Sequence, residues 1–399
     1  MNGGAAKASY RLHNALLGEQ IDSKLFVVDK ISNDNTVISN GKKGKFFIKL
    51  REKIDEFPQR LYKNRDSTYF SISWLGFDSL VSTINEINPD VVHFHWVNKG
   101  MLRLENLKKI NLPIVFSLHD EWLYTGGCHY SGNCFKYENI CKSCMVLNSN
   151  KIKDLSYFNF KRKENIFQDL NMSVVGLSNW IAKSAQKSSL LNGVNVVNLP
   201  NPIDTEIFRP IDKKYSRKIW NLPYTKKLIL FGAVSALNDS RKGFKELNEV
   251  LKKIKNKKEY ELVVFGGAKL KPQDLHGIRT NYLGNLKDET DLVKLYNAAD
   301  ILVVPSLQEN LSNVIMEGLS CGLPVLAFDI GGNSDLIDHK QNGYLAKSKD
   351  SDDMFNGLEW ILKESNFATL KLKAREKVLY KFKNEIVAKQ YIKLYQSVI

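Results

Sequence analysis

The stretch from Pro305 to Leu345 reads PSLQENLSNVIMEGLSCGLPVLAFDIGGNSDLIDHKQNGYL and decides the fold. It follows an apolar strand pattern at 301–304 and contains a helix pattern, a second apolar strand (324–328) and the glycine pair Gly331-Gly332. Glu309 and Glu317 stand at the junction between the first strand and the helix. An open parallel sheet binds ligands at the carboxyl ends of its strands, where helix N-termini offer N–H groups to phosphates. Because carboxylates accept hydrogen bonds from sugar hydroxyls, this stretch predicts a pocket for a phosphate ester that is also a polyol.

The whole pattern resembles the donor-site signature of the retaining family-4 glycosyltransferases. The resemblance rests on the glutamate pair, Cys321-Gly322, Pro324-Val325 and Gly331-Gly332. It implies an α/β GT-B fold, in which two Rossmann-like, doubly wound domains face each other across a cleft. It also implies that Glu309 contacts donor-sugar hydroxyls, that Glu317 contacts ribose hydroxyls, and that the amides of Leu311, Ser312, Asn313 and Val314 face the diphosphate and sugar. Taken alone, either glutamate could be a solvated helix-end charge favoured by the helix dipole.

Two further motifs fit the donor side of this resemblance. Arg241-Lys242-Gly243 follows the apolar run 227–231, and Lys242 matches the family's diphosphate-binding lysine. Arg241 is expected to replace an upstream basic partner that residues 232–235 lack, although a surface charge is the commoner role for either residue. Gly4 opens the first helix after Gly3, where a glycine lets backbone approach a ligand closely.

His119 ends the strand pattern 114–118 and matches a family histidine near the donor sugar and acceptor. A hydrogen-bonded structural role is the alternative for any single histidine. Asp120 ranks second, and His93 and His95 fit either role equally. The expected catalytic residues are therefore His119, Lys242 and Glu309, with no catalytic metal or other cofactor.

A length of 399 residues predicts two domains. Strand patterns that alternate with helix patterns indicate parallel sheets, and the prolines at 202 and 210 mark a linker. We expect an acceptor-side domain over 1–200, a nucleotide-sugar donor domain over 205–375, and a basic amphipathic segment over 376–399 that crosses back to the first domain. The family's apolar first strand has no counterpart before Gly3-Gly4. This suggests a late start or a truncated gene, and a chain that folds poorly or is inactive, because lost ladder hydrogen bonds destabilise a sheet.

Four cysteines lie in a predicted insertion over residues 121–146: Cys128, Cys134, Cys141 and Cys144. Four thiols can hold a structural zinc ion, and the last pair has a typical ligand spacing. Reduced cysteines packed beneath a loop and redox-sensitive disulfides are the alternatives. A similar insertion occurs in exopolysaccharide glycosyltransferases of the colanic-acid type, which supports the subfamily and not a metal. Cys321 is expected in the core.

The chain carries 58 basic and 43 acidic residues, a net charge of +15. No zinc-finger spacing, RNA-recognition signature or basic-aromatic stripe accompanies this charge, so we expect no nucleic-acid partner. We expect many of the lysines to form a solvated surface and the protein to be cytoplasmic, with peripheral contact to the inner face of the membrane. The expected substrates are a nucleotide-sugar donor and a glycan or lipid-linked acceptor in the synthesis of capsule, exopolysaccharide or O-antigen. A sugar-nucleotide epimerase and a non-catalytic nucleic-acid or membrane-binding protein are the alternatives.

Overall fold

The computed structural model describes residues 3–30, 32–39, 45–232, 239–286 and 288–399. It divides into unit 1 (Met1–Pro200 with Ala388–Ile399) and unit 2 (Asn201–Val387). The chain thus returns to unit 1 at Ala388. The segment expected to cross back was placed from residue 376, which is twelve residues earlier. Met1 and Asn2, and residues 233–238 upstream of Arg241, lie outside the described residues.

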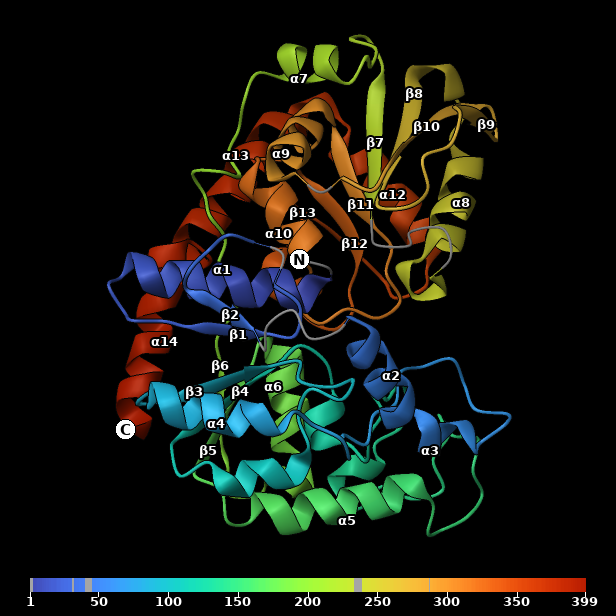
Figure 1. Ribbon diagram of the computed structural model, residues 1–399. Coiled ribbons are helices and arrows are strands. Elements are labelled where there is room, and N and C mark those ends of the chain that lie inside the picture. The colour runs from blue at the N-terminus through green and yellow to red at the C-terminus, as the bar shows by residue number, and fades with distance from the viewer. Residues whose placement is uncertain (1–2, 31, 40–44, 233–238, 287) are drawn as a thin grey trace. The chain divides into compact units, whose positions relative to one another are not determined.

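Unit 1 is built from short parallel strands and helices (Figure 1). Its elements are α1 (Gly4–Gly18), β1 (Leu25–Val27), β2 (Val37–Ser39), α2 (Lys45–Asp55), α3 (Phe57–Arg60), α4 (Asp78–Ile87), β3 (Val92–His95), β4 (Ile114–Leu118), α5 (Leu155–Phe167), β5 (Met172–Gly176), α6 (Asn179–Gln186) and β6 (Asn195–Asn198). One sheet has the order β3-β4-β5-β6, and β1 pairs with β2 in a second sheet, all in parallel. Among the described residues, α1 is the first element.

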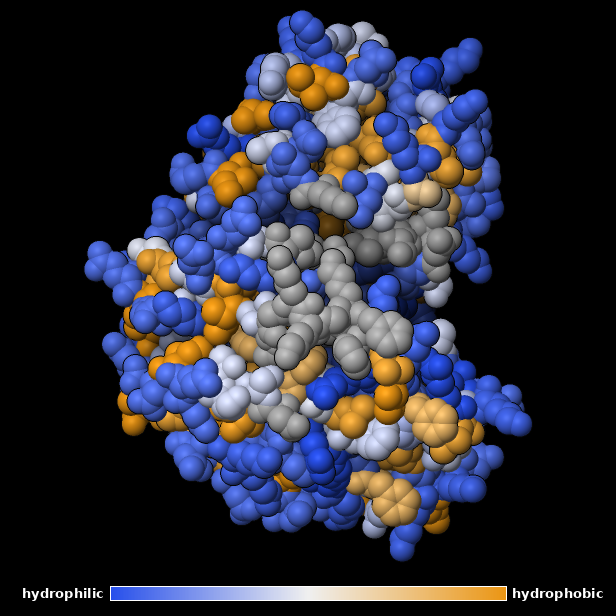
Figure 2. Space-filling model, viewed as in Figure 1, coloured by the Kyte–Doolittle hydropathy of each residue, from blue (hydrophilic) through white to orange (hydrophobic). Residues whose placement is uncertain are grey.

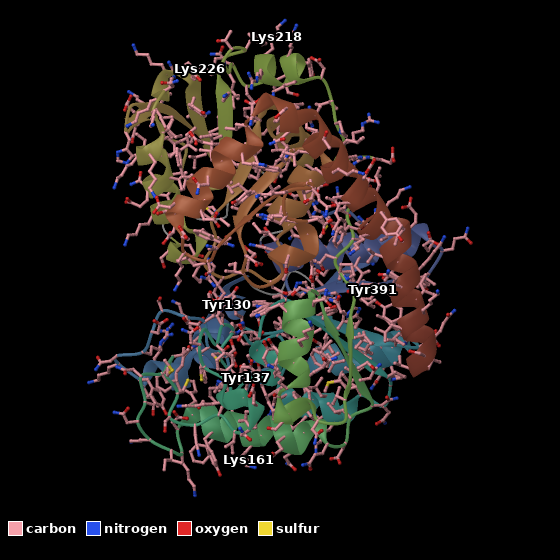
Figure 3. The ribbon with its side chains drawn as sticks, turned by 180° about the vertical axis from the view of Figure 1, so that it is seen from behind. Tyr130, Tyr137, Lys161, Lys218, Lys226 and Tyr391 are labelled. Carbon is pink, nitrogen blue, oxygen red and sulfur yellow. The ribbon has the colours of Figure 1, made fainter. Side chains whose placement is uncertain are left out.

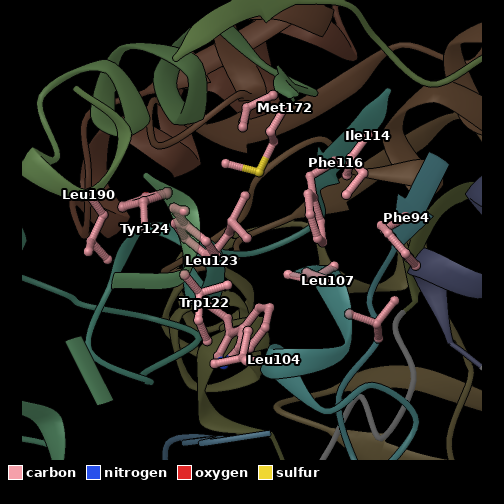
Figure 4. Packing of buried hydrophobic residues seen from close by; sticks show 14 of the residues in the cluster. Phe94, Leu104, Leu107, Ile114, Phe116, Trp122, Leu123, Tyr124, Met172 and Leu190 are labelled. Carbon is pink, nitrogen blue, oxygen red and sulfur yellow. The ribbon is translucent and has the colours of Figure 1, made fainter. Parts of the chain in front are cut away.

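The core of unit 1 forms around β4 and β5, which are apolar at most positions and buried at all five positions each. Phe94 stacks on Phe116 with ring centroids 5.0 Å apart, and aromatic side chains after β4 fill the space beneath (Figure 4). Lys163 of α5 is also fully buried, where its ammonium donates to the carbonyls of Trp122 and Thr125. Lys163 therefore does not belong to the solvated surface expected for many of the lysines, because the carbonyls of Trp122, Leu123 and Thr125 replace water around its ammonium.

Unit 2 has a seven-stranded sheet of order β13-β12-β11-β7-β8-β10-β9, parallel except for the edge strand β9. Its elements are α7 (Lys213–Ile219), β7 (Lys227–Gly232), α8 (Phe244–Lys253), β8 (Tyr260–Phe265), β9 (Gln273–Leu275), β10 (Ile278–Gly284), α9 (Glu289–Ala298), β11 (Ile301–Val304), α10 (Asn313–Ser320), β12 (Val325–Phe328), α11 (Asn333–Leu336), β13 (Gly343–Ala346), α12 (Ser351–Ile361) and α13 (Glu364–Lys381). Figure 1 shows α8 and α12 on one side of this sheet and α9 and α10 on the other.

The last helix, α14 (Asn384–Val398), begins in unit 2 and ends in unit 1. The amphipathic segment expected over 376–399 is not one continuous helix, because the helical structure breaks at Phe382 and Lys383. At this break the Phe382 carbonyl accepts a hydrogen bond from the Ile203 amide at 2.9 Å, and Ile203 forms a parallel bridge with Lys383. A long-range backbone contact therefore interrupts a pattern that is continuous in the sequence.

Candidate functional site

The predicted donor residues of unit 2 gather where the strand order of its sheet reverses. From β7 the chain proceeds outward to β8 and β10, and later returns to β11 on the other side of β7. A doubly wound sheet binds ligands at such a switch point, outside the carboxyl ends of the two strands. Lys242 lies beyond β7 and Glu309 lies beyond β11, so the topology brings both to this edge.

Lys242 and Glu309 contact each other directly. The Lys242 ammonium lies 2.9 Å from a carboxylate oxygen of Glu309, and the two side chains are 25% and 17% exposed. The Ser306 hydroxyl lies 3.4 Å from the same oxygen. The pair is thus partly open to solvent, and a ligand phosphate can approach the lysine while the carboxylate accepts from a hydroxyl.

Two glycines hold the loop that carries Glu309. Gly243 has φ of +74°, and a Cβ there would lie 1.7 Å from the carbonyl oxygen of Pro305. Gly331 has φ of +51°, and its Cβ would lie 1.8 Å from the carbonyl oxygen of Glu309. Both positions therefore require glycine for conformation and for space. The Gly331-Gly332 turn, noted in the sequence as a signature, sets the backbone position of Glu309.

Arg241 has a carboxylate partner in the structure. Its guanidinium donates to both oxygens of Asp239, at 3.0 and 2.8 Å, and the pKa of Asp239 is lowered by this arginine against the opposing effect of burial. A guanidinium in a fork-like contact with one carboxylate offers fewer donors to a diphosphate. Lys242 is the better placed of the two cations for that role.

Glu317 is buried within α10, where the Tyr296 hydroxyl donates to its carboxylate at 2.8 Å. Tyr296 is 1% exposed and belongs to α9. This tyrosine was not predicted, because its contact with Glu317 depends on two helices packing together. This hydrogen bond fixes the orientation of the Glu317 carboxylate.

The start of α10 provides the expected amides. Ser312 caps the helix, and its hydroxyl accepts from the Ile315 amide at 3.5 Å. Leu311 and Ser312 are buried, and Asn313 and Val314 form the first turn, where amides have no carbonyl of the same helix to bond. These amides and the helix dipole favour a negatively charged group at this end.

In unit 1, His93, His95 and His119 lie in a row at the ends of β3 and β4. The imidazole of His95 lies 3.0 Å from that of His119, and the rings of His93 and His95 are 4.1 Å apart between centroids. Burial lowers the pKa of His119 to about 4 and that of His93 to about 3, and it places the pKa of His95 well below 6.5. All three are therefore neutral at pH 7.

The other side of His93 meets α14. Its ring nitrogens lie 2.7 Å from the Tyr395 hydroxyl and 2.9 Å from the Ser117 hydroxyl, and its ring stacks on Tyr391. These contacts give His93 a structural role. His95 connects this packed histidine to His119, so it supports His119.

Asp120 accepts three hydrogen bonds. They come from the Trp96 indole (2.8 Å), the His129 imidazole (2.7 Å) and the Trp122 amide (2.9 Å). Its pKa is lowered because these partners, His129 first, outweigh the effect of burial. Asp120 therefore fixes the turn that follows His119. His129 was not predicted as a partner, because its contact with Asp120 forms only when the insertion folds back over this turn.

The structure has a small hollow beside His119 and a larger hollow away from the predicted donor residues. One of about 20 Å³, lined by His119, Asp120 and Trp96 among others, has room for about one water molecule. A larger hollow of about 610 Å³ lies on unit 2 against α13, and none of the predicted donor residues lines it. The α13 hollow lies away from the switch point, and its charged lining (Asp338, Lys373, Glu376 and Lys377) is a different set from the predicted donor residues.

Gly4, the glycine predicted to let the backbone approach a ligand, is the first residue of α1 and is exposed to solvent.

The four cysteines of the insertion do not form a zinc site in the part of the chain that the structure describes, which holds no group of three or more His, Cys, Asp or Glu arranged to bind a metal. All are free thiols, and burial raises the pKa of Cys141 to about 12 and that of Cys128 well above 9. Cys128 and Cys141 are buried, which matches the alternative of reduced cysteines packed beneath a loop. Cys321 is buried, as expected.

Several known proteins have sequences similar to parts of this chain. Residues 227–364 match the family of group 1 glycosyl transferases. The glycosyltransferase MJ1607 of Methanocaldococcus jannaschii is 26% identical over 77% of this chain and 75% of its own length. The N,N'-diacetylbacillosaminyl-diphospho-undecaprenol α-1,3-N-acetylgalactosaminyltransferase of Campylobacter jejuni is 28% identical over 49% of this chain, and the match spans about half (53%) of that relative.

Solved structures show the same architecture. Sucrose-phosphate synthase from Thermosynechococcus elongatus superposes with a TM-score of 0.70 at 19% identity, over 99% of this chain and 94% of that one. HepE from Anabaena, solved with UDP-glucose, gives a TM-score of 0.59 at 18% identity, over 80% and 81%. The expected GT-B fold is confirmed. The sequence matches support a glycosyltransferase of the group 1 type.

Proposed function

We propose that the protein is a retaining glycosyltransferase of bacterial surface-polysaccharide synthesis, of the colanic-acid type. It moves a sugar from a nucleotide-diphosphate sugar to a lipid-linked or glycan acceptor. The observation that carries this proposal is the contact between Lys242 and Glu309 at the switch point, beside the first turn of α10. A cation, a carboxylate and helix-end amides match the diphosphate and hydroxyls of such a donor.

The charges at this site suit departure of a diphosphate. As the sugar–oxygen bond breaks, negative charge develops on the leaving phosphate, and Lys242 and the α10 amides stabilise it. Glu309 orients the sugar hydroxyls, and Glu317, held by Tyr296, orients the ribose. With retention, the acceptor hydroxyl attacks from the face that the diphosphate leaves, so the reaction needs no protein nucleophile. His119, neutral at pH 7, serves as a hydrogen-bonding group and not as a cation.

Donor and acceptor classes follow from the relatives. HepE has been solved with UDP-glucose, which supports a uridine nucleotide sugar as the first donor to test. The Campylobacter relative acts on a diphospho-undecaprenol-linked sugar, which supports a lipid-linked acceptor. Such an acceptor would bring a cytoplasmic enzyme to the inner face of the membrane. Within the described residues, no helix has the length and hydrophobicity to span a bilayer.

A panel of nucleoside diphosphates and their sugars, screened by thermal shift, tests the donor site. A ligand that binds the folded protein raises its melting temperature by mass action. We expect one nucleotide to stabilise wild type and to stabilise Lys242→Ala much less. If no nucleotide shifts the melting temperature, the proposal fails.

Transfer is tested with the identified donor and a lipid-linked acceptor, with the anomeric configuration of the product read by NMR. Conversion of the donor sugar without an acceptor would instead indicate an epimerase. An inverted product would contradict retention while leaving the transferase class intact.

A further inference from the structure

Residues 49–61 of unit 1 form a helical segment whose polar side faces the protein. α2 and α3 are joined at Glu56, which keeps a right-handed helical backbone, and the Glu56 amide donates to the Glu52 carbonyl at 3.0 Å. A surface helix normally buries its apolar stripe and exposes its polar face. Here the arrangement is reversed, and a reversed helix needs a second apolar environment.

The inward side is held by polar contacts. Asp55 is 3% exposed and accepts from the amides of Trp74 and Leu75 at 3.1 and 3.2 Å. Arg51 donates to the Gly76 carbonyl and lies over the Phe77 ring at 4.5 Å. These contacts fix which side of the segment faces solvent.

The outward side is apolar. Leu50, Ile54, Phe57 and Leu61 follow one another at spacings of four, three and four, and they are 42%, 41%, 58% and 70% exposed. This spacing places them on one stripe of a helix. Figure 2 shows hydrophobic side chains gathered on the surface over α2 and α3.

The exposed charges beside this stripe have one sign. Lys49, Lys53, Arg60 and Lys63 are exposed, while Glu52, Asp55 and Glu56 are partly or fully buried. Every exposed residue from 49 to 64 is therefore basic or apolar, apart from Asn64. An apolar stripe flanked by basic residues is typical of a helix that lies in the interface of an anionic bilayer.

We propose that the stripe Leu50, Ile54, Phe57 and Leu61, with its flanking lysines and arginine, is the surface by which this protein binds anionic phospholipid membranes. This proposal rests on the proposed function, because a lipid-linked acceptor would lie at such a membrane. A protein partner fits less well, because lysine is depleted in protein interfaces and basic residues are enriched beside membrane-binding helices.

Sedimentation with vesicles tests the surface directly. The full chain is mixed with vesicles of phosphatidylcholine alone or with 30% phosphatidylglycerol (roughly a bacterial level of anionic lipid), at low and high salt. We expect binding only to the anionic vesicles, weakened by salt. Phe57→Ser with Leu61→Ser should reduce the bound fraction roughly tenfold or more, and Lys49→Gln with Lys53→Gln should have a similar effect.

The matched control is Leu372→Ser with Tyr380→Ser on α13, where the side chains are 58% and 78% exposed. We expect it to bind vesicles like wild type, and all variants to keep the wild-type melting temperature. Equal loss in the control, equal binding to neutral vesicles, or no binding by wild type would overturn the proposal. Self-association through this stripe without vesicle binding would assign it to a second copy instead.

The vesicle assay needs no nucleotide, so it is independent of the donor site. Vesicle binding by a protein that no nucleotide stabilises would reject the proposed function and keep the membrane surface. The reverse result would keep the transferase and reject this surface.

Discussion

Lys242 and Glu309 form an ion pair between two side chains that are both partly exposed, and such a pair contributes about 1 kcal/mol or less to stability. We therefore expect Lys242→Ala to melt close to wild type. Loss of a cation that faces a departing diphosphate should lower kcat/KM roughly 100-fold or more. Steady-state kinetics and a melting curve on the same preparation measure both effects.

Lys226 supplies the matched control, since it forms a similar 2.9 Å pair with Glu261 at the amino end of β7 (Figure 3). Glu261 is 6% exposed on its side chain, so Lys226→Ala should cost more stability than Lys242→Ala and yet keep its activity. If Lys226→Ala lost as much activity as Lys242→Ala, the role of Lys242 at the diphosphate would be rejected.

Tyr296 is expected to act by positioning Glu317. Tyr296→Phe removes one hydrogen bond to a buried carboxylate, which should cost about 1 to 3 kcal/mol of stability. The KM for the donor should rise several-fold while kcat changes less, because ribose orientation serves binding. Tyr344→Phe is the control, since its hydroxyl bonds to Asp353 at 2.8 Å instead. A donor KM equal to that of the control would contradict the positioning role.

At the scale of elements, predicted strands such as 114–118 and 301–304 are apolar at most or all positions, and both are buried on both faces. No element was predicted over 45–60, because Pro58 interrupts the helix pattern and the apolar residues do not face a core. The signature residues Lys242, Glu309 and Glu317 could be located by their order. Their supports, Tyr296 and the carbonyls beside Gly243 and Gly331, could not, since those contacts appear only when distant loops meet.

Gly331 lies against the carbonyl of Glu309 in the neighbouring loop, and its substitution tests this contact. Gly331→Ala places a methyl group against the Glu309 carbonyl at a positive φ, so we expect about 1 to 3 kcal/mol of lost stability. The displaced Glu309 should also lower transfer activity. Gly267→Ala is the control, because nothing lies within 4 Å of its Cβ position. Wild-type activity in Gly331→Ala would show that the turn does not set the position of Glu309.

At the scale of the whole molecule, the buried histidines make stability depend on pH. The folded protein keeps His93, His95 and His119 neutral at pH values where the unfolded chain, with an ordinary pKa near 6.5, binds protons. Their contribution is therefore complete above about pH 6.5 and is lost as pH falls toward about 4. Urea melts should show an unfolding free energy lower by roughly 2 kcal/mol or more at pH 5 than at pH 7. His119→Asn should reduce the slope of unfolding free energy against pH by about one bound proton. An unchanged slope would contradict the assignment of His119 as a buried, neutral histidine.

The C-terminal helix gives unit 1 an unusual order of synthesis. The ribosome makes most of unit 1 before unit 2, yet Tyr391 and Tyr395, which pack against His93, are made after unit 2. Domains usually fold as units during translation, the N-terminal one first. Here β3 lacks its contacts with Tyr391 and Tyr395 until all of unit 2 has been synthesised. Synthesis of unit 1 thus begins before that of unit 2 and is completed after it.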